Sequence, residues 1–412
     1  MKNILHFDIK IEDGIFEKIV GEKDSIGYYD LPTQDLNYLK EYIKEFKKNT
    51  DYETIKDIVV IGIGGSSLGS KAIYRALKPI RSFSKKLHFF ESTDPVAIRS
   101  TLETIDAQNA HFLVISKSGT TVETISVYKY VLGYLSKKDI CLDYRFTFVT
   151  DHGSKLEHHA KTMKSFLLHI PNKVGGRFSV LSAAGLAPLF LIGVDVQKLL
   201  DGALNIQRSF FEDGYIKNTI LKKATYYAKN SMRYNINTLF AYSESLKYFS
   251  EWYVQLWGES LGKKQKNSSF NVGLTPIGLI GPKDQHSFLQ LIVEGLRDKS
   301  VTVLKVENFN DTIKIPNVTL HGIEELDLIN NIAFCDLINM QADSTIEALL
   351  DKEDIPVDTI TIKQVNEENI GKLIFYYELL TSVVGQMMDV NAYDQPGVED
   401  GKQILKRKLL KK

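Results

Sequence analysis

The residues that first suggest chemistry in this sequence are glycines and serines within VVIGIGGSSLGSKAIYRAL, at positions 59–77. An apolar β-branched run is typical of a buried strand, and the residues after Ser67 follow a helical pattern. Gly62, Gly64 and Gly65 allow the backbone to turn tightly and to approach a ligand closely. Because the first turn of a helix has unpaired N–H groups, this arrangement predicts an anion-binding site.

Two common phosphate-binding loops fit this stretch poorly. A P-loop needs Gly-Lys-Ser/Thr, whereas Gly69, Ser70 and Lys71 have a different order. The dinucleotide fingerprint needs a third glycine where this chain has Ser67. Glu91 closes the next predicted strand, where an acid could meet a ribose. A dinucleotide-dependent oxidoreductase therefore remains an alternative at this point.

A second loop, within VISKSGTTVETISVYKYVL at 114–132, favours the phosphate of a small metabolite. Four hydroxyl residues surround Lys117 there, namely Ser116, Ser118, Thr120 and Thr121. One hydroxyl is enough to cap a helix. Additional hydroxyls beside free N–H groups at a helix start can hold a phosphate monoester.

The composition excludes several classes of protein. The chain has 412 residues, of which 43% are hydrophobic, and its 51 basic residues balance 51 acidic ones. A nucleic-acid partner is not expected, because such proteins carry a basic excess. The two cysteines, Cys141 and Cys335, suggest neither a disulfide framework nor a zinc ribbon. The longest apolar stretch, 183–194, contains Pro188 and is too short to span a bilayer, so it predicts a buried helix. We expect a soluble, cytoplasmic protein without a membrane partner.

Strand-like and helix-like runs alternate along most of the chain, which predicts an α/β fold with mainly parallel sheets. Predicted strands lie at 57–62, 87–90, 111–116, 144–150, 237–243, 301–306 and 358–363. Predicted helices lie at 67–77, 95–104, 121–135 and 153–163, with a largely helical connector at about 180–232 and closing helices after 366. The strand, loop and helix pattern of 59–77 recurs at 111–135 and 238–258, which suggests two related halves without a flexible linker.

Several motifs carry a resemblance to a known family. SKSGTTVET is similar to the sugar-phosphate motif of sugar isomerase (SIS) domains. GIGGSSLG, GGRFSVLSAAGL (175–186), GESLGK (258–263), DQHSF (284–288) and YDQPGVEDGK (393–402) together resemble the glucose-6-phosphate isomerase family, in the same order. The resemblance covers about 55–405. It implies two α-β-α sandwich subdomains of SIS type with mainly parallel sheets, followed by a C-terminal helical segment.

The expected organisation has five parts. They are an N-terminal segment (1–50), a first SIS-type subdomain (51–175), a helical connector (176–235), a second SIS-type subdomain (236–390), and a C-terminal catalytic turn and helix (391–412). The chain is short beside many family members, so some peripheral elements are expected to be missing.

The resemblance implies a reversible aldose–ketose isomerisation of glucose 6-phosphate and fructose 6-phosphate, by ring opening and an enediolate. It makes Glu259 the base that moves a proton between C1 and C2. It assigns ring opening to His286 and Lys402, and enediolate stabilisation to Arg177, whose fork of donors suits a developing anion. The surroundings alone favour plainer interpretations of three of these residues: Glu259 as an exposed Glu at a helix end, His286 as a surface His, and Lys402 as a solvated Lys.

The expected substrate-binding residues come from both loops and from two later motifs. They are Gly65, Ser66, Ser116, Lys117, Ser118, Thr121, Gly176 and Gln395. The reaction requires no cofactor and no metal, and we predict neither. DHGSKLEHH at 151–159 offers His152, Glu157, His158 and His159, but the adjacent His158 and His159 cannot share a helix face.

The expected partner is a small-molecule sugar phosphate, and a second copy of the chain is expected in a homodimer. The resemblance implies that His286 enters the active site of the neighbouring subunit. A regulatory SIS module that only senses a sugar phosphate is the non-enzymatic alternative. Such a module could dispense with Glu259, His286, Arg177 and Lys402, whereas all four stand within their motifs here.

Overall fold

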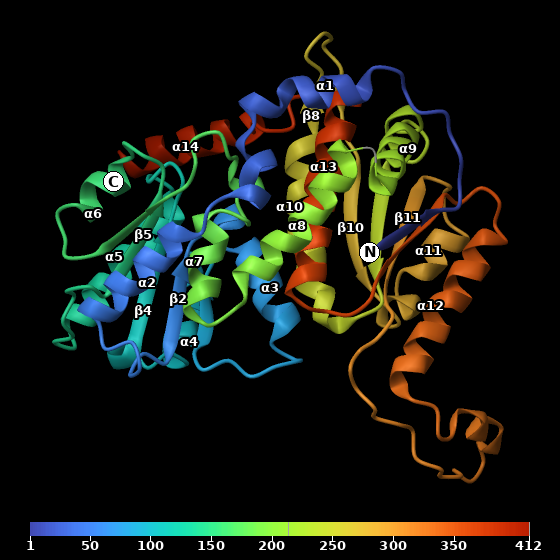
Figure 1. Cartoon of the computed structure of the whole chain (residues 1–412), viewed down its shortest axis with the longest axis horizontal. Helices are drawn as coiled ribbons and strands as arrows, with labels where there is room; N and C mark the ends of the chain where they lie inside the picture. Colours follow the sequence, from blue (N-terminus) through green and yellow to red (C-terminus); the bar gives the residue numbers. More distant parts are fainter. Residues whose placement is uncertain (213, 412) are drawn as a thin grey trace.

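Two five-stranded sheets organise the chain, which a computed structural model describes over residues 1–212 and 214–411 (Figure 1). The first sheet contains β2 (Asp57–Ile61), β3 (Lys86–Phe90), β4 (Ala110–Ile115), β5 (Phe146–Thr150) and β6 (Phe166–His169). Its order is β3-β2-β4-β5-β6, and all neighbouring strands are parallel. Every residue of β2, β4 and β5 is buried, because helices cover both faces of a parallel sheet.

Helices α2 (Asn37–Asn49), α3 (Leu68–Leu77), α4 (Pro95–Glu103), α5 (Val122–Ser136), α6 (Lys155–Ala160) and α7 (Ala183–Leu191) belong to this half. Alternate residues of each strand face opposite helical layers. Val59 and Ile61 join the hydrophobic cluster that includes residues of α4, α5 and α6. Ile58 and Val60 join the cluster that includes residues of α2, α3 and α7. The first half is therefore an α-β-α sandwich.

The second sheet contains β1 (Lys2–Leu5), β7 (Ile236–Ala241), β10 (Thr275–Ile280), β11 (Lys299–Val306) and β12 (Val357–Ile362). Its order is β1-β12-β11-β7-β10, and only β1 runs antiparallel to its neighbour. One face packs against α11 (Leu289–Val293) and α12 (Phe334–Leu350). A separate two-stranded ribbon pairs β8 (Lys263–Lys264) with β9 (Asn271–Val272). The expected fold of two α-β-α units with mainly parallel sheets is confirmed.

The remaining helices are α1 (Ile15–Glu22), α8 (Val196–Phe211), α9 (Tyr215–Lys229), α10 (Lys247–Leu261), α13 (Glu367–Met387) and α14 (Glu399–Leu409). In Figure 1, α8, α10 and α13 lie between the two sheets. The helix α13 is buried along most of its length, and one hydrophobic cluster continues through both halves. Among the described residues, no helix has the length and apolar character needed to cross a membrane.

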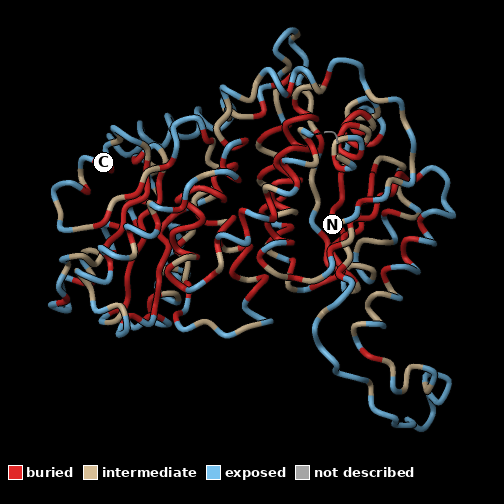
Figure 2. The backbone as a smooth tube through the Cα atoms, viewed as in Figure 1, coloured by how far each residue is buried: buried red, intermediate tan, exposed pale blue. Residues whose placement is uncertain are grey.

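A segment between β11 and α12 leaves the body of the protein as an extended arm (Figures 1 and 2). We call residues 308–333 the arm. Several of its apolar side chains are exposed, including Ile313, Val318, Leu320 and Leu328. At the other end of the molecule, none of the residues of α14 is buried, so this helix lies on the surface.

The predicted strands all occur, with ends shifted by a few residues, and the predicted buried helix at 183–194 is α7. Within the two large sheets, the prediction missed β1, β6 and β10, and each lies at the edge of its sheet. Edge strands are partly exposed and tolerate proline. Pro276 and Gly278 give the sequence of β10 the appearance of a loop.

Candidate active site

Two glycine-containing turns pack directly against each other at the boundary of the two halves. The first is η3 (Gly64–Ser66), after β2, and the second is η5 (Gly176–Phe178). A Cβ atom on Gly65 would lie 2.2 Å from the Gly176 carbonyl oxygen and 2.7 Å from the Arg177 nitrogen. Only glycine permits this approach, which holds η3 against the backbone that carries Arg177. Ser66, at the end of η3, is half-buried.

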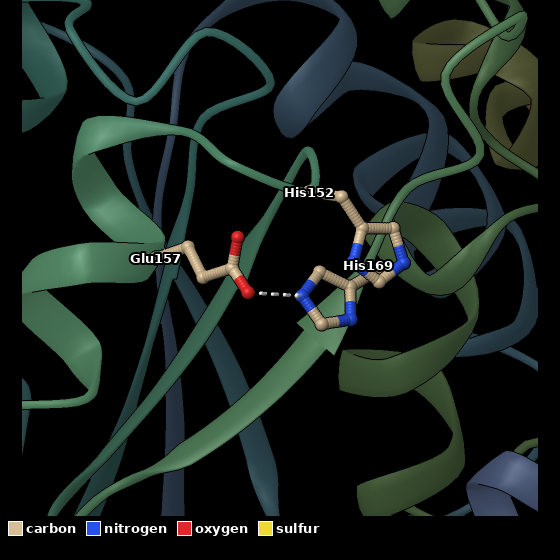
Figure 3. A group of neighbouring side chains, drawn as sticks. All are labelled: His152, Glu157 and His169. Carbon is tan, nitrogen blue, oxygen red and sulfur yellow. Dashed lines mark hydrogen bonds and ion pairs between the residues drawn. The ribbon is translucent and has the colours of Figure 1, made fainter.

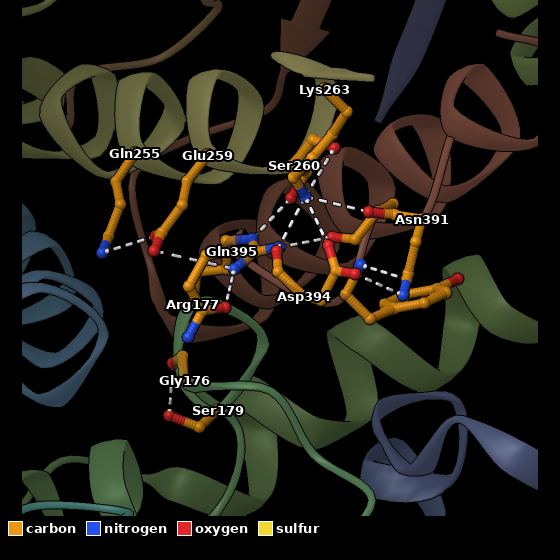
Figure 4. A network of polar contacts seen from close by, with 12 residues as sticks. Gly176, Arg177, Ser179, Gln255, Glu259, Ser260, Lys263, Asn391, Asp394 and Gln395 are labelled. Atoms are coloured by element: carbon orange, nitrogen blue, oxygen red, sulfur yellow. Dashed lines mark hydrogen bonds and ion pairs between the residues drawn. The ribbon is translucent and has the colours of Figure 1, made fainter. Parts of the chain in front are cut away.

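Arg177 lies at the centre of the polar network of the site (Figure 4). Arg177 is 3% exposed, and its Nε donates to Ser260 Oγ at 2.6 Å. One terminal nitrogen donates to Gln395 Oε1 at 3.0 Å. The other donates to the carbonyls of Ala392 at 2.5 Å and Asp394 at 2.8 Å. Burial lowers the pKa of the Arg177 guanidinium, and the Glu259 carboxylate opposes this shift.

Glu259 lies on the last turn of α10, with its carboxylate directed toward Arg177. Oε1 is 3.8 Å from the Arg177 Nη1, and the Glu259 side chain is 28% exposed. Oε2 accepts a hydrogen bond from Gln255 Nε2 at 3.2 Å, one helical turn earlier. The same Gln255 nitrogen would meet a Cβ on Gly64 at 2.7 Å. Glu259 therefore lies beside a fixed cation and close to η3, while solvent can still reach it.

The turn that contains Gln395 is held by Lys263 as well as by Arg177. Lys263 Nζ donates to the carbonyl oxygens of Asn391 at 2.8 Å and Asp394 at 2.7 Å. It also pairs with the Asp394 carboxylate at 3.2 Å. Burial and the nearby Arg177 lower the pKa of Lys263, against the opposing effect of Asp394. Two cations thus bind the carbonyls of a single turn.

The N-terminal segment anchors the same turn from the other side. The Tyr393 hydroxyl donates to the Glu22 carboxylate at the end of α1, and its oxygen lies 2.9 Å from Ser382 Oγ, which can donate to it. Gln386 and Tyr29 also donate to that carboxylate, Tyr29 at 2.6 Å. Residues 1–50 carry no recognised motif, yet they help to fix the position of the turn.

The loop at 116–121, which contains the four hydroxyl residues and Lys117, lies at the carboxyl end of β4 and leads into α5. Thr121 is the N-cap residue of α5, but its side chain makes no capping hydrogen bond. Its hydroxyl instead lies 3.0 Å from Ser116 Oγ. The first N–H groups of α5 therefore have no side-chain cap from this residue, which is the arrangement that favours an anion.

Lys117 and Ser118 have partners within the protein. Lys117 Nζ donates to Asp151 Oδ2 at 2.9 Å and to the Asn172 carbonyl at 3.1 Å. Ser118 Oγ accepts from the Thr120 amide at 3.3 Å. The Lys117 ammonium is thus engaged by Asp151, and an anion in this loop would meet hydroxyls and amides first.

Among the described residues, His286 and Lys402 make no hydrogen bond or ion pair with Arg177, whose partners are given above. His286 ends η7 (Lys283–His286), and its side chain is exposed. The Lys402 side chain is 61% exposed on α14 and pairs with Glu399 at 2.7 Å. In the described part of the chain, neither is hydrogen-bonded to Glu259, whose partners are Gln255 and Arg177. Of the four predicted catalytic residues, the structure brings together Glu259 and Arg177.

The sequence motifs contained further members of this network that our prediction did not name. Ser260 and Lys263 belong to GESLGK, and Asp394 belongs to YDQPGVEDGK. Their presence in these motifs was the available signal. Their roles depend on contacts between residues far apart in the sequence, such as Arg177 with Ser260 and Gln395, which no local pattern encodes.

A separate cluster of His152, Glu157 and His169 lies at the carboxyl ends of β5 and β6 (Figure 3). His158 and His159 do not join it. His158 Nδ1 is 2.8 Å from the Ser154 carbonyl, and His159 Nε2 is 2.8 Å from the Tyr128 hydroxyl. His169 was missed because it follows on the next strand, outside the motif at 151–159.

Comparison with known proteins gives relatives that share one description. A family model described as phosphoglucose isomerase matches residues 32–411. The chain is 41% identical over 386 residues to glucose-6-phosphate isomerase of Campylobacter jejuni, a match that covers 93% of this chain and 92% of that protein. It is 36% identical over 371 residues to glucose-6-phosphate isomerase of Methanocaldococcus jannaschii, with 88% and 86% covered.

Solved structures share the fold. A hypothetical protein from Thermus thermophilus matches with a TM-score of 0.87 at 29% identity, covering 98% of this chain and 100% of that one. A glucose-6-phosphate isomerase from Chlamydia trachomatis matches with a TM-score of 0.77 at 23% identity, covering 90% and 72%. The latter similarity supports the architecture alone.

Proposed function

This chain belongs to the phosphoglucose isomerase family, and on that premise we propose how it interconverts glucose 6-phosphate and fructose 6-phosphate. Its relatives carry the name glucose-6-phosphate isomerase, and the reaction of that name is an aldose–ketose isomerisation. In the proposed mechanism the sugar ring opens, Glu259 moves a proton between C2 and C1, and an enediolate forms in between. The observation that carries this proposal is the Glu259 carboxylate lying beside the buried guanidinium of Arg177.

The proposed proton path needs one base and one fixed cation. Glu259 takes the proton from C2 of the open-chain aldose and returns it to C1 of the enediolate, so the carboxylate is regenerated. Between these two steps the hydroxyl proton on O2 passes to O1, which leaves the carbonyl at C2 of the ketose. Between these two steps negative charge develops on the substrate oxygens. A preorganised cation stabilises such charge without reorganising, and Arg177 is held by four hydrogen bonds in the resting site.

The substrate phosphate is proposed to bind at the start of α5. Ser116, Ser118 and Thr121 would supply hydroxyls, and the first N–H groups of the helix would face the anion. Lys117 would contribute through its backbone, since its ammonium pairs with Asp151. The sugar would be bordered by Gly65, Ser66 and Gly176, and met from the turn after α13 by Gln395.

Ring opening is proposed to use His286 and Lys402. The position of His286 is compatible with a role in a second subunit, and the position of Lys402 is compatible with movement of α14. His286 is exposed, so its imidazole can reach a neighbouring molecule. The helix that carries Lys402 has no buried residue, so it can shift at little cost in packing. We propose that His286 serves the active site of a second copy in a homodimer.

The arm supports that homodimer. Its apolar side chains include Ile313, which is 64% exposed, and Leu328, which is 73% exposed. Exposed apolar side chains that gather on one segment are typical of interaction sites. The Gln285 amide, next to His286, donates to the Gln341 carbonyl of α12 at 3.5 Å. His286 therefore neighbours the helix into which the arm leads, on the face proposed for the second copy.

A reducing compartment, proposed as the cytoplasm, is supported by the cysteines. Cys141 and Cys335 are both free thiols, and free thiols persist where the surroundings keep them reduced.

The proposed role of Glu259 is tested by Glu259→Gln, with Glu251→Gln as a matched control on the same helix. Glu251 is exposed on α10. Turnover of fructose 6-phosphate should fall by roughly 10²–10⁴ in Glu259→Gln and stay near the parent value in the control. In deuterium oxide, the parent protein should incorporate deuterium at C1 or C2, and Glu259→Gln should not. Retained exchange in that variant would remove Glu259 from the mechanism.

A further inference from the structure

The connection from β5 through α6 to β6 gathers three side chains that can bind a metal ion. His152 lies in the turn after β5, Glu157 on α6, and His169 at the end of β6. Since Thr150 and His169 are paired in register on parallel strands, the turn after β5 begins beside His169. One ligand atom of each residue lies within 4.8 Å of the other two. In Figure 3 the two imidazoles lie beside the Glu157 carboxylate.

The two oxygen atoms of Glu157 have different environments. Oε2 accepts from the Gly153 amide, and Ser154 Oγ accepts from the Glu157 amide at 3.0 Å. Together these contacts stabilise the start of α6 in the manner of a capping box. Oε1 is left for the cluster, 3.3 Å from His169 Nε2. The residue is 5% exposed, so the carboxylate is fixed in place before any ligand arrives.

The imidazoles are arranged face to face, with ring centroids 3.5 Å apart and an angle of 16° between the planes. A neutral imidazole offers the lone pair of one ring nitrogen to a metal ion, so each ring can supply one ligand atom. His152 is exposed, so its ring can rotate toward Oε1 and His169 without repacking the interior.

We propose that His152, Glu157 and His169 form a binding site for a divalent cation of the Zn²⁺ type. Two imidazoles and one carboxylate are a ligand set that suits Zn²⁺ and related transition metals, and they leave coordination positions for water. Mg²⁺ and Ca²⁺ prefer oxygen ligands and fit this set poorly. The cluster shares no residue with those proposed for isomerisation, so the site is additional to that activity.

Lys161 would compete with the metal ion for the Glu157 carboxylate. Its ammonium lies 2.7 Å from Glu157 Oε1, the same oxygen that the metal would use. The Lys161 side chain is 62% exposed, so it can move into solvent. Removing its charge should therefore strengthen metal binding rather than weaken it.

The test is a Zn²⁺ titration of the full chain after dialysis against a chelator, followed by competition with a chromophoric zinc indicator. The parent protein should show one saturable site. His152→Ala and His169→Ala should each weaken it by at least about tenfold, the lower end of the loss seen even for outer partners of metal ligands. His158→Ala is the matched control, since this exposed histidine lies on α6 beside Glu157 and should leave the affinity unchanged.

Two further arms separate this site from adventitious binding to surface histidines. Lys161→Met should raise the Zn²⁺ affinity, and an excess of Mg²⁺ should not displace Zn²⁺. Thermal melting of each apo variant checks that it is folded. The proposal is overturned if the parent protein shows no saturable site, if His158→Ala weakens binding as much as His169→Ala, or if Lys161→Met lowers the affinity.

Discussion

Replacing Arg177 by lysine keeps the positive charge but removes the fork of donors, and this separates geometry from charge. A lysine Nζ placed near the position of the Arg177 Nη2 could keep the carbonyls of Ala392 and Asp394, which both contact that nitrogen. It would then lose Ser260 Oγ and Gln395 Oε1, which meet other nitrogens of the guanidinium.

The size of the effect follows from these two losses. Hydrogen bonds to charged groups contribute about 1.5–3 kcal/mol each, so two of them amount to roughly 3–6 kcal/mol. The lower end applies here, because Gln395 is half-buried and water can replace its partner. Since about 1.4 kcal/mol corresponds to tenfold, we expect Arg177→Lys to lower kcat/KM by about two orders of magnitude.

The structural part of this loss should be local. Residues 391–398 are tied to the protein by Arg177 and Lys263, and α14 beyond them has no buried residue. Amide hydrogen exchange of 391–398 should therefore accelerate in Arg177→Lys, while exchange in the two sheets stays slow.

Steady-state kinetics of fructose 6-phosphate conversion, with exchange measured by mass spectrometry, provide the assay. Arg145→Lys is the matched control, because Arg145 also donates to backbone carbonyls, of Gln108 and Ala110, at the opposite end of the first sheet. The control should keep kcat/KM within about twofold, in the range of ordinary surface effects. An Arg177→Lys variant that matches this control would refute the assignment of Arg177 to the site.

Three further predictions concern binding, assembly and stability. Thr121→Ala should mainly raise KM, because it weakens substrate and transition state alike; a loss confined to kcat in steady-state assays would argue against a phosphate loop. Mixing Glu259→Gln with His286→Ala subunits should restore activity, up to about half that of the parent per mixed dimer, if each site uses both chains; no rescue, with subunit exchange verified by a tag, points to a single-chain site. Burial raises the pKa of Glu378 well above its usual value, and neither of its carboxyl oxygens has a hydrogen-bond partner among the described residues. A carboxylic acid whose pKa is raised in the folded state destabilises the protein as the pH rises above its unfolded pKa of about 4.3. In urea unfolding, Glu378→Met should therefore raise the free energy of unfolding by about 1–3 kcal/mol near pH 7.5 and by less at pH 5. An equal increase at both pH values would contradict the raised pKa of Glu378.

The fold was predictable wherever strands are central and helices amphipathic. The strands β2, β4 and β5 are buried on both faces, so their apolar runs are unbroken and easily recognised. The missed strands are held at sheet edges by their neighbours: β10 pairs with β7 despite Pro276, and β1 pairs with β12 across nearly the whole sequence. Their strand character depends on tertiary pairing, which a local pattern does not contain.

The sequence predicts which motifs contribute residues to the site, but it does not predict how those residues contact one another. Glu259 and Arg177 were expected together because both motifs resemble one family, and their proximity is found in the structure. The contacts of Ser260, Lys263 and Glu22 around Arg177 and the turn at 391–395 were not expected. Each joins segments that are distant in sequence, so only the packed fold defines them.

The glycines of η3 illustrate how a sequence motif can carry a second physical meaning. Close approach of backbone to a ligand was the first interpretation of Gly65, and that role remains a prediction. Its hydrogen atom also fills the space against Gly176, where a Cβ would lie 2.2 Å from a carbonyl oxygen. Any larger residue at 65 must push away the turn that begins with Gly176, and Arg177 would move with it. The position of the cation beside Glu259 therefore depends on a glycine that packs against backbone atoms of Gly176 and Arg177, because backbone packing sets where the Arg177 side chain begins.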